Sequence, residues 1–157
     1  MTFILIIVAA FVAGYFVNRM LMQRRANEAA NEIEPALSEF EALVSEDDFD
    51  SMVLRSSHRV PVMVDFFASW CPPCRHLGPR LAAFARDYDG AFLLAKVDVD
   101  AQQALASKYG IQSMPTVLLF RDGKVVDRFV GAVGDHTIRY FLAKHEVRAP
   151  EAPAPTA

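Results

Sequence analysis

The sequence predicts an α/β fold in which a central mixed β-sheet is flanked by helices. Two buried strands, residues 60–68 and 92–99, are each followed by a helical stretch. A hairpin and a final helix then close the chain, with Asp122 and Gly123 at the hairpin turn. Strands separated by helices and followed by a hairpin imply a mixed sheet between helical layers.

Each element has its own signal in the sequence. The first strand is short, and an acidic helix start follows it. Asp89 and Gly90 interrupt the chain after the first long helix, and Gly110 ends the second. In chain order, we expect a strand at 40–44, a helix start at 45–48, a strand at 60–68, a helix at 74–88, a strand at 92–99, a helix at 101–109, strands at 116–120 and 125–130, and a helix at 137–145.

The N-terminus carries an uncharged apolar run over residues 2–17, which Met20, Leu21 and Met22 extend. A helix needs roughly 17–25 residues to cross a bilayer, and snorkelling by Arg19 can make up a small deficit. We therefore predict that residues 1–25 form a transmembrane helix with a basic flank. The alternative is a cleaved secretory signal, but no basic residue precedes the run and no small-x-small site follows it.

The basic residues Arg19, Arg24 and Arg25 follow the apolar run, whereas no basic side chain precedes it. The positive-inside rule then predicts a single-pass protein of a bacterial-type inner membrane, with its domain in the cytoplasm. A periplasmic domain is the alternative. Residues 26–38 are predicted as a polar helical linker, 39–146 as the folded domain, and 147–157 as a disordered Pro/Ala tail.

Composition excludes some classes of function. The net charge of −3 and the mixed charges provide no broad cationic surface for nucleic acid. Only two cysteines are present, so the chain has no disulfide framework of a small secreted fold. We expect no metal site, because a structural zinc site needs about four ligands and the histidines are scattered. These histidines are His58, His76, His136 and His145.

The two cysteines, Cys71 and Cys74, lie three positions apart where a strand gives way to a helix. At a helix N-terminus, free backbone N–H groups and the helix dipole stabilise a thiolate, which lowers the pKa of Cys71. Cys71 is then the attacking nucleophile, and the shielded Cys74 resolves the mixed disulfide. The bare motif also allows a chance pair or a metal site.

The segment VDFFASWCPPCRHLGP resembles the active-site strand, turn and helix of the thioredoxin family. The segments AKVDVD, SMPT, DGKVV and VGAV continue the similarity from about residue 40 to residue 144 without a large insertion. The resemblance implies a thioredoxin fold for residues 39–146, preceded here by the predicted transmembrane helix.

The resemblance also implies roles for individual residues. Asp65 matches the family's buried carboxylate, which acts through water as the general base for Cys74, and Lys96 lies nearby to moderate its charge. Met114 and the cis-proline Pro115 belong to a loop that pairs with the substrate chain, together with Trp70 and Gly131. Burying the Asp65 charge is costly, so its pKa is expected to be raised. The alternatives are a solvent-exposed Asp65, a solvated Lys96 and a trans Pro115.

The sequence departs from the family between the cysteines, where Pro72 and Pro73 replace the usual Gly-Pro. Pro72 removes a backbone N–H and stiffens the turn, so the donors available to the Cys71 thiolate can differ. His76 follows the pair, but we expect a solvent-facing side chain and assign it no catalytic role.

These observations predict a membrane-tethered thiol-disulfide oxidoreductase that reduces or exchanges protein disulfides through Cys71 and Cys74. Its expected partners are protein disulfides, a reductase as electron donor, and the membrane through the N-terminal helix. No cofactor is expected beyond the redox-active disulfide. The alternatives are a thioredoxin-fold interaction or assembly subunit of a membrane complex, and a periplasmic reductant in envelope or cytochrome biogenesis.

Overall fold

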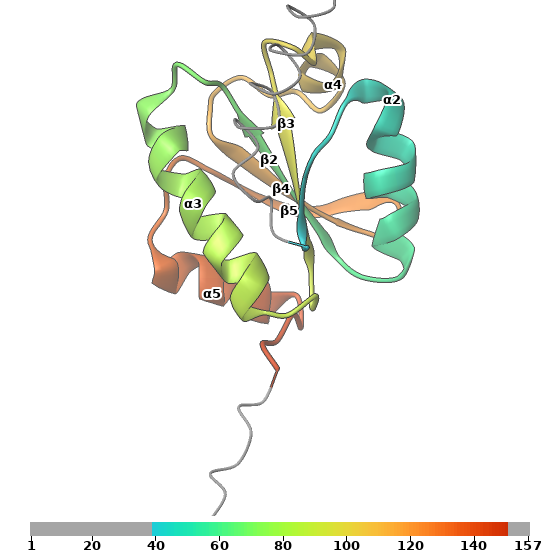
Figure 1. Ribbon diagram of the computed structural model, residues 1–157, viewed down its shortest axis with the longest axis vertical. Helices are drawn as coiled ribbons and strands as arrows, with labels where there is room; N and C mark the ends of the chain where they lie inside the picture. The colour runs from blue at the N-terminus through green and yellow to red at the C-terminus, as the bar shows by residue number, and fades with distance from the viewer. Residues whose placement is uncertain (1–38, 151–157) are drawn as a thin grey trace, which may run out of the picture. The chain divides into compact units, whose positions relative to one another are not determined.

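The computed structural model describes residues 39–150, which form a five-stranded mixed sheet with helices on both faces (Figure 1). The strand order is β1-β3-β2-β4-β5. The strands are β1 (Glu41–Leu43), β2 (Val62–Phe67), β3 (Leu93–Asp98), β4 (Thr116–Arg121) and β5 (Lys124–Val130). The helices are α2 (Glu46–Phe49), the π-helical turn η1 (Asp50–Arg55), the 3-10 turn η2 (Ser56–His58), α3 (Pro72–Asp87), α4 (Gln103–Lys108) and α5 (Asp135–Lys144).

The sheet confirms the predicted mixed topology. Strand β3 runs parallel to β1 and β2, whereas β4 runs antiparallel to both β2 and β5. The β4–β5 hairpin turns at Asp122 and Gly123, which have φ angles of 53° and 73°. Both lie in the left-handed region that a two-residue hairpin turn requires, as the Asp-Gly pair predicts.

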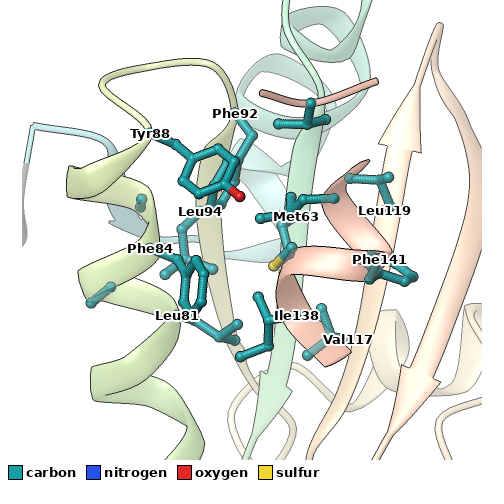
Figure 2. Close-up of a cluster of buried hydrophobic side chains, with 14 of the residues drawn as sticks. Met63, Leu81, Phe84, Tyr88, Phe92, Leu94, Val117, Leu119, Ile138 and Phe141 are labelled. Carbon is teal, nitrogen blue, oxygen red and sulfur yellow. The ribbon is translucent and has the colours of Figure 1, made fainter. Parts of the chain in front are cut away.

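Two apolar clusters hold the layers together on opposite faces of the sheet. Figure 2 shows the first, in which Leu81 and Phe84 from α3 and Ile138 from α5 surround Met63 of β2. The second packs Phe49 of α2 and Leu105 of α4 against the other face. The central strands β2 and β4 therefore bury side chains on both faces of the sheet. This explains why both strands are almost continuously apolar in sequence.

The segment between α2 and β2 contains a structure that the sequence analysis did not assign. Beyond the four residues of α2, the chain continues as η1 and then η2. Ser57, in the middle of η2, is buried, and its hydroxyl donates to the Leu54 carbonyl oxygen at 2.7 Å. The same hydroxyl oxygen accepts from the Gly123 N–H at 2.8 Å, which joins this segment to the hairpin turn.

The predicted transmembrane helix lies outside the described residues. Among residues 39–150, no helix is long and apolar enough to cross a bilayer. The longest of them, α3, has 16 residues, and its charged side chains include Arg75, Arg80 and Arg86. The predicted inner-membrane localisation depended on the apolar run at residues 2–17, which lies outside this part of the chain.

Candidate active site

The N-terminus of α3 presents the two cysteines. Cys71 is the N-cap residue with extended backbone angles, and its Sγ accepts a hydrogen bond from the Cys74 N–H at 3.3 Å. Pro72 and Pro73 occupy the first two helical positions and have no N–H to donate. The Cys74 N–H is therefore the first helical amide that can stabilise negative charge on the Cys71 sulfur.

Cys71 and Cys74 are joined by a disulfide, with their Cα atoms 5.3 Å apart, so the structure represents the oxidised state. They pack with Ala68, and Phe67 and Met114 lie beside them. Cys71 is 3% exposed and Cys74 is 4% exposed. In the oxidised state, therefore, exposure alone does not separate the expected nucleophile from the expected resolving cysteine.

The loop before β4 approaches the disulfide. The Met114–Pro115 peptide bond is cis, and the Met114 carbonyl oxygen lies 3.6 Å from Cys71 Sγ. The Gly131 N–H donates to the Pro115 carbonyl oxygen at 2.8 Å, which ties the end of β5 to this loop. Gly131 has a φ of 89°, and a Cβ there would meet no atom within 4 Å. A glycine is therefore favoured at this position because of the positive φ and not because of a lack of space.

Trp70 stands beside the disulfide as an exposed aromatic side chain, 61% accessible. Its indole N–H donates to the Asp100 carboxylate at 2.7 Å. Asp100 follows β3, and the sequence analysis gave it no role. Met114 therefore packs beside the disulfide, Trp70 directly precedes Cys71 in the chain, and Gly131 is joined to the Met114–Pro115 loop through the Pro115 carbonyl.

Asp65 lies in the middle of β2 and is 1% exposed. Within residues 39–150, neither of its carboxylate oxygens has a hydrogen-bond partner. Burial raises the pKa of Asp65 to about 7, although the Lys96 charge lowers it and the Glu41 charge raises it further. The expected rise is therefore present, and its main cause is the loss of hydration of the charged form.

Lys96 is the direct neighbour of Asp65 across the parallel β2–β3 pair. Its side chain is 25% exposed, so it is not the fully solvated lysine that the sequence left open. Its Nζ lies 3.3 Å from a carboxylate oxygen of Glu41 and 5.4 Å from the centre of the Phe67 ring. The sequence analysis missed Glu41, whose only signal was an acidic side chain in a strand between Phe40 and Ala42.

A pocket of about 270 Å³ connects these groups. Asp65, Lys96 and Cys74 all line it, as do Gly78 and Pro79 on α3. The pocket has room for water, and the Asp65 carboxyl and the Lys96 ammonium can supply polar partners for it. Proton exchange between Asp65 and Cys74 through water is therefore geometrically possible.

The remaining sequence-predicted residues do not gather into another site. His76 is exposed on α3, as expected for a residue without a catalytic role. In the part of the chain that the structure describes, no three His, Cys, Asp or Glu residues are grouped so that they could hold a metal ion. The expected absence of a metal and of a cofactor stays a prediction.

Comparison with known proteins agrees with the fold and the cysteine pair. The family model "Thioredoxin" matches residues 40–144. Thioredoxin 1 of a Nostoc species is 43% identical over 104 residues, which cover 66% of this chain and 95% of that protein. A thioredoxin of Chlorobaculum thiosulfatiphilum is 42% identical over 106 residues, covering 68% of this chain and 94% of the relative. The mitochondrial thioredoxin of Mus musculus is 43% identical over 97 residues, or 62% and 57% of the two chains.

A cysteine pair closed into a disulfide at the start of a helix, on a sheet of this topology, defines a protein-disulfide oxidoreductase. The chain belongs to the thioredoxin family. The predicted inner-membrane localisation is corrected by this comparison, because the similar proteins are named thioredoxins and none of these names describes a bacterial inner-membrane protein.

Proposed function

We propose that the protein reduces disulfides in other proteins, with Cys71 as nucleophile and Cys74 as resolving cysteine. The observation that carries this proposal is the Cys71 sulfur at the tip of α3, which accepts the Cys74 N–H and is bonded to Cys74. Members of the thioredoxin family act on protein disulfides, which supports the same direction of reaction.

In the first step, the Cys71 thiolate of the reduced protein attacks one sulfur of the substrate disulfide. A Cys71–substrate disulfide forms, the substrate S–S bond breaks, and the second substrate sulfur leaves with the electron pair as a thiolate. The α3 dipole and the Cys74 N–H favour the Cys71 anion. Because Pro72 and Pro73 have no amide hydrogen, the Cys74 N–H supplies a large share of the hydrogen-bond stabilisation of the Cys71 thiolate.

In the second step, Cys74 loses its proton and attacks Cys71, which releases the first substrate sulfur as a thiolate. The Cys71–Cys74 disulfide remains, so two electrons have passed from the protein to the substrate. We assign the Cys74 proton to the Asp65 carboxylate through water in the shared pocket. A carboxyl with a pKa of about 7 is ionised in part of the molecules at neutral pH and can accept that proton.

For substrate binding, we assign an extended substrate chain to the surface formed by Trp70, Met114, Pro115 and Gly131. The close approach of the Met114 carbonyl oxygen to Cys71 supports this assignment, because a chain that pairs with this loop would bring its own sulfur to Cys71. Exposed Trp70 would add apolar contact area at the edge of the surface.

The cycle requires a reductant to reopen the Cys71–Cys74 disulfide, and we propose a dithiol reductase as electron donor. No organic cofactor or metal takes part in the exchange as written. We further propose residues 39–146 as the boundaries of the redox domain. Val147, one residue further on, is also buried in the core.

Reduction of the insulin disulfides by dithiothreitol, with and without the protein, tests the proposed function. We expect the wild type to accelerate the reaction and Cys71→Ser to show only the uncatalysed rate. Cys74→Ser should accumulate a covalent adduct with the substrate through Cys71. The exposed neighbour His76→Ala is the matched control and should retain wild-type activity. Equal rates for the wild type and Cys71→Ser would favour an interaction module without redox activity.

A further inference from the structure

The ion pair between Glu41 and Lys96 stands next to the proposed proton acceptor but is not part of the exchange mechanism. Glu41 begins the edge strand β1, and its side chain is only 7% exposed. Its Oε1 lies 3.3 Å from Lys96 Nζ. A carboxylate this deeply covered needs a cation or hydrogen-bond donors to stay charged, and Lys96 supplies the cation.

The backbone register brings Glu41 within reach of Lys96. In the parallel β1–β3 pair, Glu41 is opposite Leu94, and side chains two residues apart on a strand share a face. Glu41 therefore reaches diagonally along the face that carries Lys96. Asp65 flanks Lys96 on the other side, in β2, so one ammonium group stands between two carboxyl groups.

The two carboxyl groups do not share Lys96 equally. Lys96 Nζ is in ion-pair distance of Glu41, whereas Asp65 has no hydrogen-bond partner among residues 39–150. The Lys96 ammonium also lies near the Phe67 ring, and a Cβ added at Gly78 would be 3.9 Å from it. The Lys96 ammonium thus already lies beside α3, at the pocket that Asp65 and Cys74 also line.

We propose that Glu41 is a positioning residue, which holds the Lys96 ammonium away from Asp65 and so sets the pH range in which Asp65 can accept the Cys74 proton. This inference rests on the proposed function of Asp65. Glu41 touches neither the substrate nor the sulfur atoms, and it acts through Lys96. Glu41 therefore affects the pH dependence of mixed-disulfide resolution, and the bonds that Cys71 and Cys74 form and break stay the same.

Among residues 39–150, few other charged groups face Asp65. Lys96 on β3 and Glu41 on β1 are the charged groups that act on Asp65 from the sheet. From α3, Arg75 and the Cys74 thiol of the reduced protein line the same pocket as Asp65. Opposite Asp65 on β4 lies Val117, which does not titrate. The Glu41 charge raises the pKa of Asp65 and the Lys96 charge lowers it, so changes at either residue have opposite expected signs.

The test is a titration of the Asp65 carboxyl in the reduced full-length protein, followed by the 13C signal of its side chain. In Glu41→Gln, Lys96 is free to approach Asp65, and the pKa of Asp65 should fall by about 1 pH unit relative to wild type. Glu39→Gln is the matched control, because it removes the same charge from an exposed side chain that has no ion pair with Lys96. It should leave the Asp65 titration unchanged.

A double variant separates positioning from direct repulsion between the two carboxylates. In Lys96→Met, the pKa of Asp65 should rise, and adding Glu41→Gln should then lower it by much less than in the presence of Lys96. An equal fall with and without Lys96 would show that Glu41 acts on Asp65 directly, and would overturn the proposal. An unchanged Asp65 titration in Glu41→Gln would overturn it too. If Glu41→Gln does not fold, comparing Lys96→Met with wild type still tests it, because a lower pKa in Lys96→Met would contradict the role of Lys96.

Failure of this inference differs from failure of the proposed function. The titration does not require activity, so it can succeed or fail whatever the insulin assay shows. In the assay, the lower limb of the pH–rate profile for mixed-disulfide resolution should shift with the Asp65 pKa in Glu41→Gln. A wild type that does not reduce insulin refutes the function, whereas an active Glu41→Gln with the wild-type pH profile refutes only the role of Glu41.

Discussion

Asp65 and Asp127 are carboxylates of the same sheet, yet their surroundings differ in every respect that determines a pKa. Asp65 is buried in a central strand with no partner among the described residues, and burial raises its pKa to about 7. Asp127 lies in β5 and accepts from Lys144 at 2.7 Å, and the His145 ring nitrogen is at 2.8 Å. The Lys144 hydrogen bond, followed by that of His145, lowers the pKa of Asp127 to about 2.

The difference shows how one residue type can perform proton transfer in one place and stabilise the fold in another. The Asp127 carboxylate joins the end of α5 to β5, because its negative charge accepts hydrogen bonds from Lys144 and His145. Asp65 is charged only at a cost to stability, so its proton is easily exchanged near neutral pH. The following changes test this division between a functional and a structural carboxylate, from the largest expected effect to the smallest.

Asp65→Asn should change the pH dependence of stability most. Well below the unfolded-state pKa of 3.8, the carboxyl is protonated in both the folded and the unfolded chain, and it contributes no difference in stability. Above pH 7 the folded chain bears a buried charge, which destabilises it by up to about 4 kcal/mol. Relative to wild type, Asp65→Asn should therefore gain stability as pH rises from 4 to 8, as urea unfolding at each pH would measure.

The opposite pH trend in that series, with Asp65→Asn losing stability relative to wild type as pH rises, would mean that Asp65 is stabilised as an anion. Asp127→Asn serves as the contrasting control, because its carboxylate is stabilised as an anion. Its effect on stability should have the opposite sign at neutral pH.

Asp65→Asn should also slow resolution of the mixed disulfide at pH 7 by about a hundredfold, because an amide cannot take the Cys74 proton. Single-turnover insulin reduction by the pre-reduced protein would measure this rate. Asp127→Asn should retain the wild-type rate, since Asp127 contacts Lys144 and His145 rather than the cysteines. Equal slowing in both variants would point to a general loss of structure.

Asp127→Asn should destabilise the fold by about 1 kcal/mol at neutral pH, a value reduced from the full pKa change because the site is partly open to solvent. The folded-state pKa is lowered, so this stabilisation is present above pH 4 and disappears as pH falls through about 2. Thermal unfolding at pH 7 and pH 2 would measure it, and a variant equally destabilised at both pH values would contradict the ion-pair explanation.

Trp70→Phe should have the smallest effect. The substitution keeps an aromatic surface but removes the indole N–H that Asp100 accepts, in an exposed position. We expect KM for a protein disulfide to rise by about two- to fivefold with kcat unchanged. Steady-state insulin kinetics would show this, and a fall in kcat alone would assign Trp70 to the chemical steps instead.

The sequence predicted the fold in most of its elements, because local signals determine them. Apolar runs identified β2, β3 and β4, and Asp122-Gly123 identified the hairpin. The η1–η2 segment was missed because its serines and charged residues follow no regular apolar period. Its packing depends on Ser57 meeting the Gly123 amide, 66 positions away.

The site was predictable where its residues adjoin a motif and less so where tertiary contacts decide. Cys71, Cys74 and the burial of Asp65 follow from one strand-to-helix segment. The low exposure of Cys71 depends on the distant Met114 loop, and the Glu41 ion pair depends on pairing between β1 and β3. Neither contact leaves a local pattern in the sequence.

The most direct test of the account is the release of thionitrobenzoate from a mixed disulfide prepared on Cys71, measured against pH. We predict that the wild type releases it at a rate that rises with pH around a midpoint near 7, as Asp65 ionises and accepts the Cys74 proton. Cys74→Ser should retain the adduct. A pH-independent rate in the wild type, or equal release from Cys74→Ser, would contradict the account.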